Sequence, residues 1–379
     1  MEFDWTAVQQ DRYLTTLRAV RDAFPTDRPD PHRPFSRQDW STLARLGLLG
    51  SCVSDKYGGQ ALGALDTARQ FEALGEGCAD TGLVFAASAH LFACAVPLSE
   101  FGSDGLKSRY LPGLCDGSAV AGNAMTEAES GSDVSRLRVT ATEVPEGYLL
   151  NGEKSFVSNG PAADVFVTYA TTDPDSGHLG QTAFVVPADA RGVRSGELFD
   201  KMGLRSCPAG TVTFTDCLVP ADHVLGVPGM GATIFQQSMG WERACLFAGY
   251  VGMMARLVDR CVEHARTRRQ SGRRLADFQA VSHRIVDMKM RLESARLLLY
   301  RACWEMDRGS PARLSVALSK LAASEGALAS ALDAVRVFGG QGYLAGSGIE
   351  SAVRNAMPGV LFSGTSEIQK ELVAKELGL

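Results

Sequence analysis

The chain has 379 residues, 45% of them hydrophobic, which is ordinary for a globular protein and long enough for two or three packed units. Its net charge of −5 gives no reason to expect nucleic-acid binding. Nine cysteines are scattered without a Cys-x-x-Cys pair, which favours reduced thiols in a cytoplasmic protein over a disulfide framework.

The first third of the chain is predicted to be helical. The opening MEFDWTAVQQDRYL lacks a basic stretch followed by an apolar one, so it does not indicate a signal peptide. Ser36 precedes apolar residues at helical spacing that end at Gly50, and 64–77 predicts a further helix. The run 81–98 comes closest to a membrane span, but its alanines and proline favour a buried core helix. We therefore expect no membrane segment.

From about residue 121 the pattern changes to short β segments. VTATEV, GYLLNG, DVFVTYATT, TAFVVPA and GTVTFTDCLV are rich in Val, Thr, Phe and Tyr and are separated by Gly, Pro, Asp and Asn. Such spacing is typical of a small barrel or sandwich.

After Pro228 long helices return. Apolar residues in steps of three and four along 285–306 predict the seam of a helical bundle, and 312–337 predicts a further helix rich in Ala and Leu. The fold class is therefore α+β and mostly α. We expect an N-terminal α domain (1–120), a middle β-barrel or sandwich domain (121–227) and a C-terminal helical bundle (228–379).

Several common catalytic signatures are missing from the sequence. It has no phosphate-binding P-loop, no nucleophile elbow and no dinucleotide fingerprint after a strand, and its six histidines lack metal-ligand spacing, so no metal is expected. Glycine- and hydroxyl-rich turns at 125–133, 154–160, 338–342 and 363–367 remain. Their backbone N–H groups can hold a pyrophosphate or flavin oxygens, although each alone also suits an ordinary turn.

Glu242 is the most informative single residue. It lies in MGWERACLFAGYV (239–251), a predicted helix that is apolar apart from Glu242 and Arg243. A carboxylate in apolar surroundings is costly unless it is paired or used, and burial raises its pKa toward the range of a general base. The alternative is a structural ion pair with a nearby arginine, and the residues alone do not decide between the two.

Taken together these segments resemble the acyl-CoA dehydrogenase family along nearly the whole chain. AMTEAESGSD, KSFVSNGPAADVFV, KMGLRS, FTDCLVP, DAVRVFGGQGY and FSGTSEIQ occur in the family's order. The resemblance implies an N-terminal α domain, a middle β domain and a C-terminal four-helix bundle, a homotetrameric assembly and FAD as cofactor.

The resemblance also implies which residues hold FAD. The segments that contain Arg268 and Arg336 correspond to those that reach the FAD of a neighbouring subunit in the family. Phe156 stands where tryptophan is usual, and Ser158 where a threonine usually bonds the flavin. The corresponding residues are Met125, Thr126, Gly131, Ser132, Phe156, Ser158, Arg268, Gln270, Ser271, Phe278, Gln279, Arg336, Gly339, Gly340, Thr365 and Glu367.

The position of the catalytic base distinguishes members of this family. Many carry it immediately before the Gly-Thr-Ser of the C-terminal motif, where this chain has Ser363, which is no base near neutral pH. Isovaleryl- and long-chain-type members carry it before an arginine on the first long helix of the bundle, which corresponds to Glu242 and Arg243. Glu242 is therefore implied as the base, and Ser132, Arg243, Ser363 and Gly364 as substrate-site residues.

Within the family, SMGWERACLFAG, EHARTRRQ, RLESARLLLYRACWEMD and DTGLVFAASAHLFACAVP look most like the L-prolyl–carrier-protein dehydrogenases of pyrrole natural-product pathways. This implies a prolyl thioester on the phosphopantetheine arm of a peptidyl carrier protein as substrate. A short- or branched-chain acyl-CoA dehydrogenase is the first alternative, and a non-catalytic flavoprotein is the second. Oxygen and an electron-transfer flavoprotein both remain open as electron acceptor.

Overall fold

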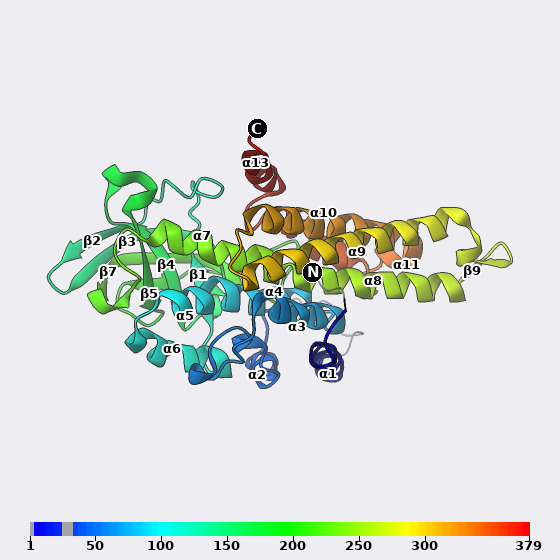
Figure 1. The fold of residues 1–379 in the computed structure, drawn as a ribbon, viewed down its shortest axis with the longest axis horizontal. Helices are drawn as coiled ribbons and strands as arrows, with labels where there is room; N and C mark the ends of the chain where they lie inside the picture. The colour runs from blue at the N-terminus through cyan, green and yellow to red at the C-terminus, as the bar shows by residue number, and fades with distance from the viewer. Residues whose placement is uncertain (1–3, 25–32) are drawn as a thin grey trace.

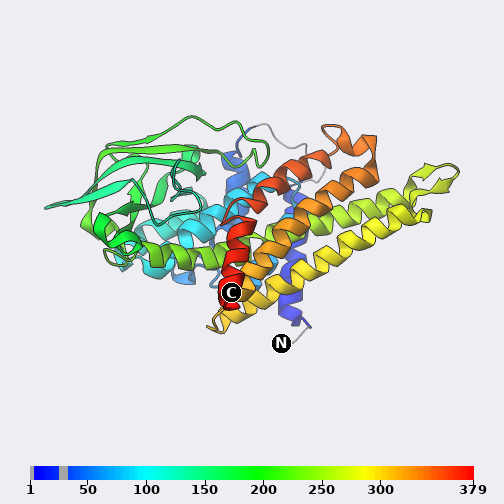
Figure 2. The ribbon, with the colours of Figure 1, turned by 90° about the horizontal axis from the view of Figure 1, so that it is seen from above.

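The structure, a computed structural model, describes residues 4–24 and 33–379. The first three residues and His32, which entered the sequence arguments, lie outside the described residues. The large sheet lies at one end of the molecule and long helices extend to the other (Figure 1). Figure 2, turned by 90°, shows the same separation.

Helices make up the N-terminal part. Ser36 caps α2 by accepting a hydrogen bond from the Asp39 N–H, but the helix ends at Arg45, earlier than expected, because Gly47 adopts a left-handed φ of 74°. The helix predicted at 64–77 is confirmed as α3. The elements are α1 (Ala7–Ala23), α2 (Arg37–Arg45), η1 (Leu48–Gly50), η2 (Asp55–Tyr57), α3 (Ala64–Gly77), α4 (Thr81–His90), η3 (Leu91–Ala95), α5 (Val96–Phe101) and α6 (Asp104–Asp116).

The apolar run after residue 80 is a core helix. The stretch Thr81–Phe101 passes through α4, the π-helical η3 and α5, and is long and apolar enough to cross a membrane. However, 94% of its most apolar window is buried inside the molecule. The predicted buried helix is thus confirmed.

The middle part forms one eight-stranded sheet in the order β6-β7-β3-β2-β4-β5-β8, with β1 parallel to β4. The long antiparallel pair β3 and β7 carries irregularities between Leu150 and Gly152 and between Lys154 and Val157. All five predicted β segments are strands. The elements are β1 (Ala121–Ala124), β2 (Thr140–Val144), β3 (Gly147–Ser158), η4 (Gly160–Ala162), β4 (Val165–Thr171), η5 (Pro174–Gly180), β5 (Gln181–Pro187), β6 (Val193–Ser195), β7 (Ala209–Pro220), η6 (Ala221–His223) and β8 (Val224–Leu225).

The C-terminal part is the predicted bundle. Met288, Leu292, Ala295, Leu299 and Cys303 of the predicted seam are all buried on α9. The elements are α7 (Gly231–Trp241), η7 (Glu242–Leu246), α8 (Ala248–Thr267), β9 (Arg269–Gln270), β10 (Arg273–Arg274), η8 (Leu275–Asp277), α9 (Gln279–Asp307), α10 (Arg313–Phe338), α11 (Gly340–Tyr343), α12 (Glu350–Ala356), η9 (Met357–Val360) and α13 (Ser366–Glu376).

One large hydrophobic core joins the N-terminal helices, one face of the sheet and the bundle. A smaller core, which includes Leu150, Phe166 and Phe214, fills the other side of the sheet. The π-helical turn η7 contacts α3, α4, α9, α10 and the other π-helical turn, η3. Glu242 therefore lies where the N-terminal helices meet the bundle.

Candidate active site

Glu242 begins the π-helical turn η7 between α7 and α8. The segment predicted as one continuous helix is thus interrupted at the predicted base. Glu242 is only 8% exposed, and Ala244, Cys245 and Leu246 after it are buried. Single π-helical turns within α-helices are frequent at functional sites.

The Glu242 carboxylate is bonded to a hydroxyl rather than to a cation. Ser363 Oγ donates a hydrogen bond to Glu242 Oε1, and Arg243 Nε donates to the Ser363 carbonyl oxygen at 2.9 Å. Within residues 4–24 and 33–379 no ion pair to Glu242 is formed, so the alternative of a structural ion pair finds no support there. The structure brings Glu242, Arg243 and Ser363 together, as expected for one site.

Burial raises the pKa of Glu242, while the Ser363 hydrogen bond and the charge of Arg243 lower it. Burial in turn lowers the pKa of the Arg243 guanidinium. A carboxyl whose pKa lies above its ordinary value is a better match for proton abstraction near neutral pH.

Ser363 and Gly364 both have left-handed backbones, with φ of 55° and 84°. Such a conformation in a residue other than glycine costs about 1–3 kcal/mol and persists where the surroundings hold it. Thr365 follows as the N-cap of α13 and accepts a hydrogen bond from the Ile368 N–H, and Glu367 is exposed in the first helical turn.

A second group of candidate residues meets where β1 ends beside β3. The Ser155 N–H donates to the Thr126 carbonyl at 2.8 Å, and Lys154 Nζ donates to the Met125 carbonyl at 3.0 Å. Phe156 lies in the irregular stretch of β3 with a φ of 54° and is 67% exposed. Ser158 ends the same strand. The structure thus places Met125, Thr126, Phe156 and Ser158 next to one another.

The loop that contains Gly131 and Ser132 is exposed. A Cβ added at Gly131 would meet no atom within 4 Å, so space is open above its backbone. Hydrogen bonds of the described residues do not join Ser132 to Glu242 or Ser363. The predicted double role of Ser132 toward FAD and substrate therefore stays a prediction.

A third group lies at the far tip of the bundle, near the label β9 in Figure 1. The rings of His264 and Phe338 stack at 4.1 Å and join the end of α8 to the end of α10. This contact brings the segment with Arg268, Gln270 and Ser271 close to Gly339 and Gly340. Phe278 and Gln279 stand at the start of α9, and Arg336 donates to Asp333 Oδ1 at 3.1 Å.

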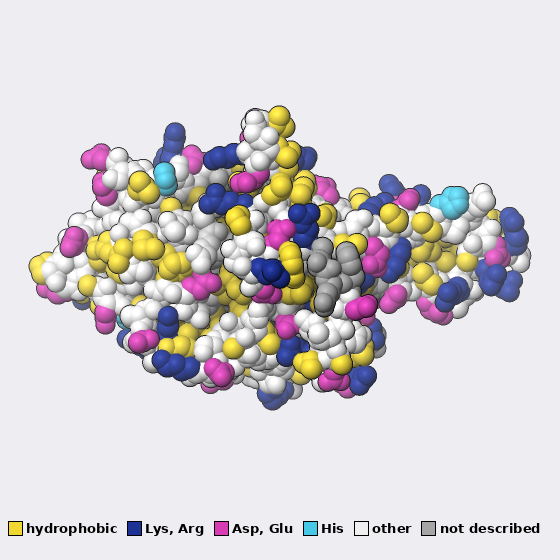
Figure 3. Space-filling model, viewed as in Figure 1, with side chains coloured by type: hydrophobic (Ala, Val, Ile, Leu, Met, Phe, Trp, Pro, Cys, Tyr) yellow, Lys and Arg dark blue, Asp and Glu magenta, His cyan; other side chains and the backbone are white. Residues whose placement is uncertain are grey.

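This tip is strongly basic. Figure 3 shows basic side chains gathered at this end of the molecule. The exposed arginines of the hairpin region are Arg266, Arg268, Arg269, Arg273 and Arg274. Within a single chain this tip lies far from Met125 and Phe156, which belong to the end that holds the large sheet (Figures 1 and 2).

Comparison with known proteins agrees with this arrangement. The N-terminal, middle and C-terminal domain descriptions of acyl-CoA dehydrogenase match residues 18–118, 122–217 and 229–378. The chain belongs to the acyl-CoA dehydrogenase family.

Individual members are similar over the full length. The chain is 51% identical to L-prolyl-[peptidyl-carrier protein] dehydrogenase of Pseudomonas fluorescens over 100% of both chains. It is 43% identical to the protein of the same name from a Serratia species, covering 100% of this chain and 99% of that one. The solved structure "PigA with FAD and proline" superposes with a TM-score of 0.98 at 43% identity over 100% of both chains. As a member of this family, the chain is an FAD-dependent oxidoreductase.

The residues present fit FAD. Phe156 offers an exposed aromatic face, and its ring contacts only the edge of Phe199 at 5.3 Å among the ring contacts of the described chain. Added Cβ atoms at Gly131, Gly339 and Gly340 would stand in open space, so their backbones are free to approach a pyrophosphate or ribose.

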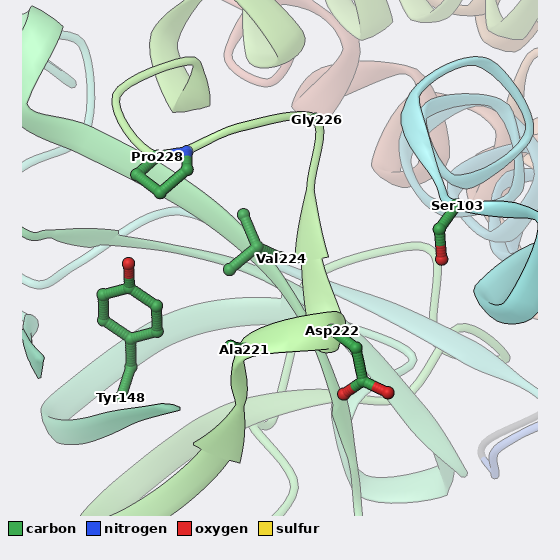
Figure 4. Close-up of a pocket in the computed structure, with 7 residues that line it drawn as sticks. All are labelled: Ser103, Tyr148, Ala221, Asp222, Val224, Gly226 and Pro228. Carbon is green, nitrogen blue, oxygen red and sulfur yellow. The ribbon is translucent and has the colours of Figure 1, made fainter. Parts of the chain in front are cut away.

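Two cavities of the described residues lie away from these groups. One of about 380 Å³ opens on the sheet and is lined by Tyr148, Asp222 and Val224 among others (Figure 4). Another of about 990 Å³ lies between α1, α3 and α9. Neither includes a predicted site residue of this acyl-CoA dehydrogenase.

Sequence reasoning missed a buried ion pair beside Met125. Lys154 Nζ lies 2.7 Å from Glu127 Oε1, with side-chain exposures of 0% and 5%. Glu127 also accepts the backbone N–H groups of Arg138 and Val139. Both residues were in segments predicted to bind FAD, but a lysine on a strand reads as a surface residue. The pair ties the loop after Thr126 to β3.

Proposed function

We propose that this enzyme oxidises an L-prolyl group, held as a thioester on a peptidyl carrier protein, to the pyrrole-2-carboxyl thioester. The observation that carries the proposal is the buried Glu242 carboxylate, bonded by Ser363 and adjacent to Arg243, in a chain similar throughout its length to L-prolyl-[peptidyl-carrier protein] dehydrogenases. The α-proton of the prolyl group is acidified by the thioester carbonyl but still needs a nearby base.

In this proposal each residue has one task. Glu242 removes the α-proton. The backbone N–H groups around Ser363 and Gly364 donate to the thioester oxygen and stabilise the developing enolate, while Arg243 holds this loop through the Ser363 carbonyl. FAD, when bound, supplies the acceptor for the β-hydride. Because a prolyl-to-pyrrole conversion removes four hydrogens and one cycle removes two, two cycles are needed.

The FAD residues divide between subunits in this proposal. Met125, Thr126, Gly131, Ser132, Phe156, Ser158, Thr365 and Glu367 hold the cofactor in one subunit, and the basic tip with Arg268 and Arg336 completes a neighbour's site. An apolar row on α9 supports assembly, since Val286, Met290 and Leu297 are 58%, 62% and 52% exposed. We expect a cytoplasmic homotetramer, with oxygen or an electron-transfer flavoprotein as acceptor.

Mass spectrometry of a prolyl-loaded carrier protein tests the reaction directly. The account predicts loss of four hydrogens from the loaded arm in the presence of the enzyme. Oxidation of only short or branched acyl-CoA esters would favour the catabolic alternative. Absence of flavin reduction with every thioester would favour the non-catalytic alternative.

A further inference from the structure

Ser363 is held at both ends by one turn of the bundle. Its hydroxyl donates to Glu242 Oε1, and its carbonyl accepts from Arg243 Nε at 2.9 Å. Glu242 and Arg243 are sequence neighbours in η7, whereas Ser363 comes from the loop before α13. Two consecutive side chains of one turn thus fix a single residue of a distant loop.

A third residue completes this hold. Gln369 of α13 is fully buried, and its Nε2 donates to the Ser363 carbonyl at 3.3 Å and to the Gly364 carbonyl at 3.1 Å. Together these contacts account for the left-handed φ of 55° at Ser363. These contacts hold the Ser363 backbone in the position from which its hydroxyl reaches Glu242 Oε1.

The two oxygens of Glu242 differ as a consequence. Oε1 accepts the Ser363 hydroxyl, and Oε2 accepts no hydrogen bond from the described residues. A hydrogen bond donated to a carboxylate favours its charged form, and here it opposes the effect of burial. Among the described residues no donor competes for Oε2, and we therefore assign this oxygen to receive the proton.

Other titratable groups around Glu242 are Arg243 on its own turn, Cys94 on η3 and Tyr169 on β4, with Lys320 of α10 beyond Arg243. Burial raises the pKa of both the Cys94 thiol and the Tyr169 phenol, so neither becomes charged near neutral pH. Burial, with the charge of Arg243, lowers the pKa of Lys320 to about 8. Ser363 is the neutral group that bonds the carboxylate directly.

We infer that Ser363 is a positioning residue for the dehydrogenation, whose hydroxyl aims Glu242 through Oε1 and keeps it ionised so that Oε2 takes the α-proton. The α-carbon–hydrogen bond breaks, an O–H bond forms at Oε2, and the electron pair stays on the substrate as the enolate. This inference rests on the proposed function, because it requires Glu242 to be the base.

The test is the pH dependence of kcat/KM for anaerobic flavin reduction by prolyl-loaded carrier protein. In Ser363→Ala the acidic limb of the profile of kcat/KM against pH should shift to higher pH by about one to two pH units, as expected for loss of a hydrogen bond to a charged group. Activity should recover at higher pH. Ser363→Gly, which suits the left-handed backbone, should give the same shift and serves if the alanine variant does not fold. Ser363→Asn, which tolerates a left-handed backbone and offers an N–H donor, should keep the acidic limb of the profile nearer its wild-type position.

Ser366→Ala is the matched control, since it removes the hydroxyl of a second serine of the same segment, a buried one, which bonds a different carboxylate, Glu325 Oε1, at 2.6 Å. It should leave the limb in place. A Ser363→Ala enzyme that loses activity equally at every pH, or that only raises KM, would overturn the inference. Lys320→Met removes the other nearby group whose pKa, about 8, lies close to neutral pH. This variant should leave the acidic limb of the profile in place.

A readout without turnover completes the test. The infrared carboxyl band that disappears in Glu242→Gln should titrate at higher pH in Ser363→Ala than in the wild type, and an unchanged titration would contradict the inference. If Glu242→Gln itself turns over normally, the proposed function fails. If that variant is inactive but Ser363→Ala shows no shift, only the role of Ser363 fails.

Discussion

At the scale of single residues, the proposed reaction depends on the surroundings of Glu242. Its position in an apolar segment and its correspondence to one of two family positions for the base were both readable from the sequence. The π-helical turn was not. Nor was the Ser363 hydroxyl contact, because it joins residues 121 positions apart in the chain. Local propensity cannot predict a hydrogen bond between such distant segments.

The first prediction concerns the base. Glu242→Gln removes the proton acceptor but keeps nearly the same shape, so the enzyme should retain FAD and lose at least ~100-fold in the rate of flavin reduction. Glu100→Gln is the control, because that exposed carboxylate accepts a hydrogen bond from Trp241 Nε1, one residue before Glu242, at 3.1 Å. It should reduce flavin close to the wild-type rate. Near-normal turnover by Glu242→Gln would remove the assignment.

At the scale of elements, hydrophobic periodicity predicted most helices and strands. It overestimated α2, which ends at Arg45 because the left-handed Gly47 interrupts a run whose apolar spacing continues. It also gave no sign that Lys154 is fully buried, since an alternating strand pattern does not identify which polar residue finds a partner inside.

The second prediction concerns that ion pair. Lys154→Met leaves the Glu127 carboxylate buried without its cation, which should lower the free energy of unfolding by about 3–5 kcal/mol in urea titrations. The double variant with Glu127→Gln should recover part of this loss, because no buried charge remains. Arg37→Met breaks an exposed pair with Asp164 at 3.2 Å and should cost less than about 1 kcal/mol. Equal losses for Lys154→Met and Arg37→Met would contradict the buried-pair argument.

At the scale of the whole molecule, the candidate FAD residues occupy two distant places in one chain. The sequence resemblance predicts that Arg268 and Arg336 serve a neighbouring subunit, and this stays a prediction; the basic tip lies at the opposite end of the chain from the sheet (Figures 1 and 3). The geometry of the assembled site depends on how subunits pack, which neither the sequence pattern nor a single chain contains.

The third prediction concerns this sharing. Arg268→Ala should weaken FAD retention by roughly 1.5–3 kcal/mol through loss of a charge-assisted phosphate contact. Arg274→Ala is the control, since that arginine bonds Asp277 at 2.9 Å within the same hairpin and should keep FAD. Flavin content after dialysis at low free FAD measures both. Full occupancy in Arg268→Ala would argue against a shared site.

The central claim is that the acyl group arrives on a carrier protein. Free proline is a carboxylate whose negative charge opposes α-deprotonation, and a thioester removes that charge. Docking of a carrier, commonly acidic, on a basic surface should weaken with added salt.

Anaerobic flavin reduction with prolyl-carrier protein, prolyl-CoA and free L-proline at equal concentration tests this claim most directly. The account predicts fast bleaching of the flavin with the carrier thioester, little with the CoA ester and none with free proline. Equal rates with the carrier and CoA thioesters would contradict carrier recognition, and bleaching by branched acyl-CoA alone would contradict the proposed substrate.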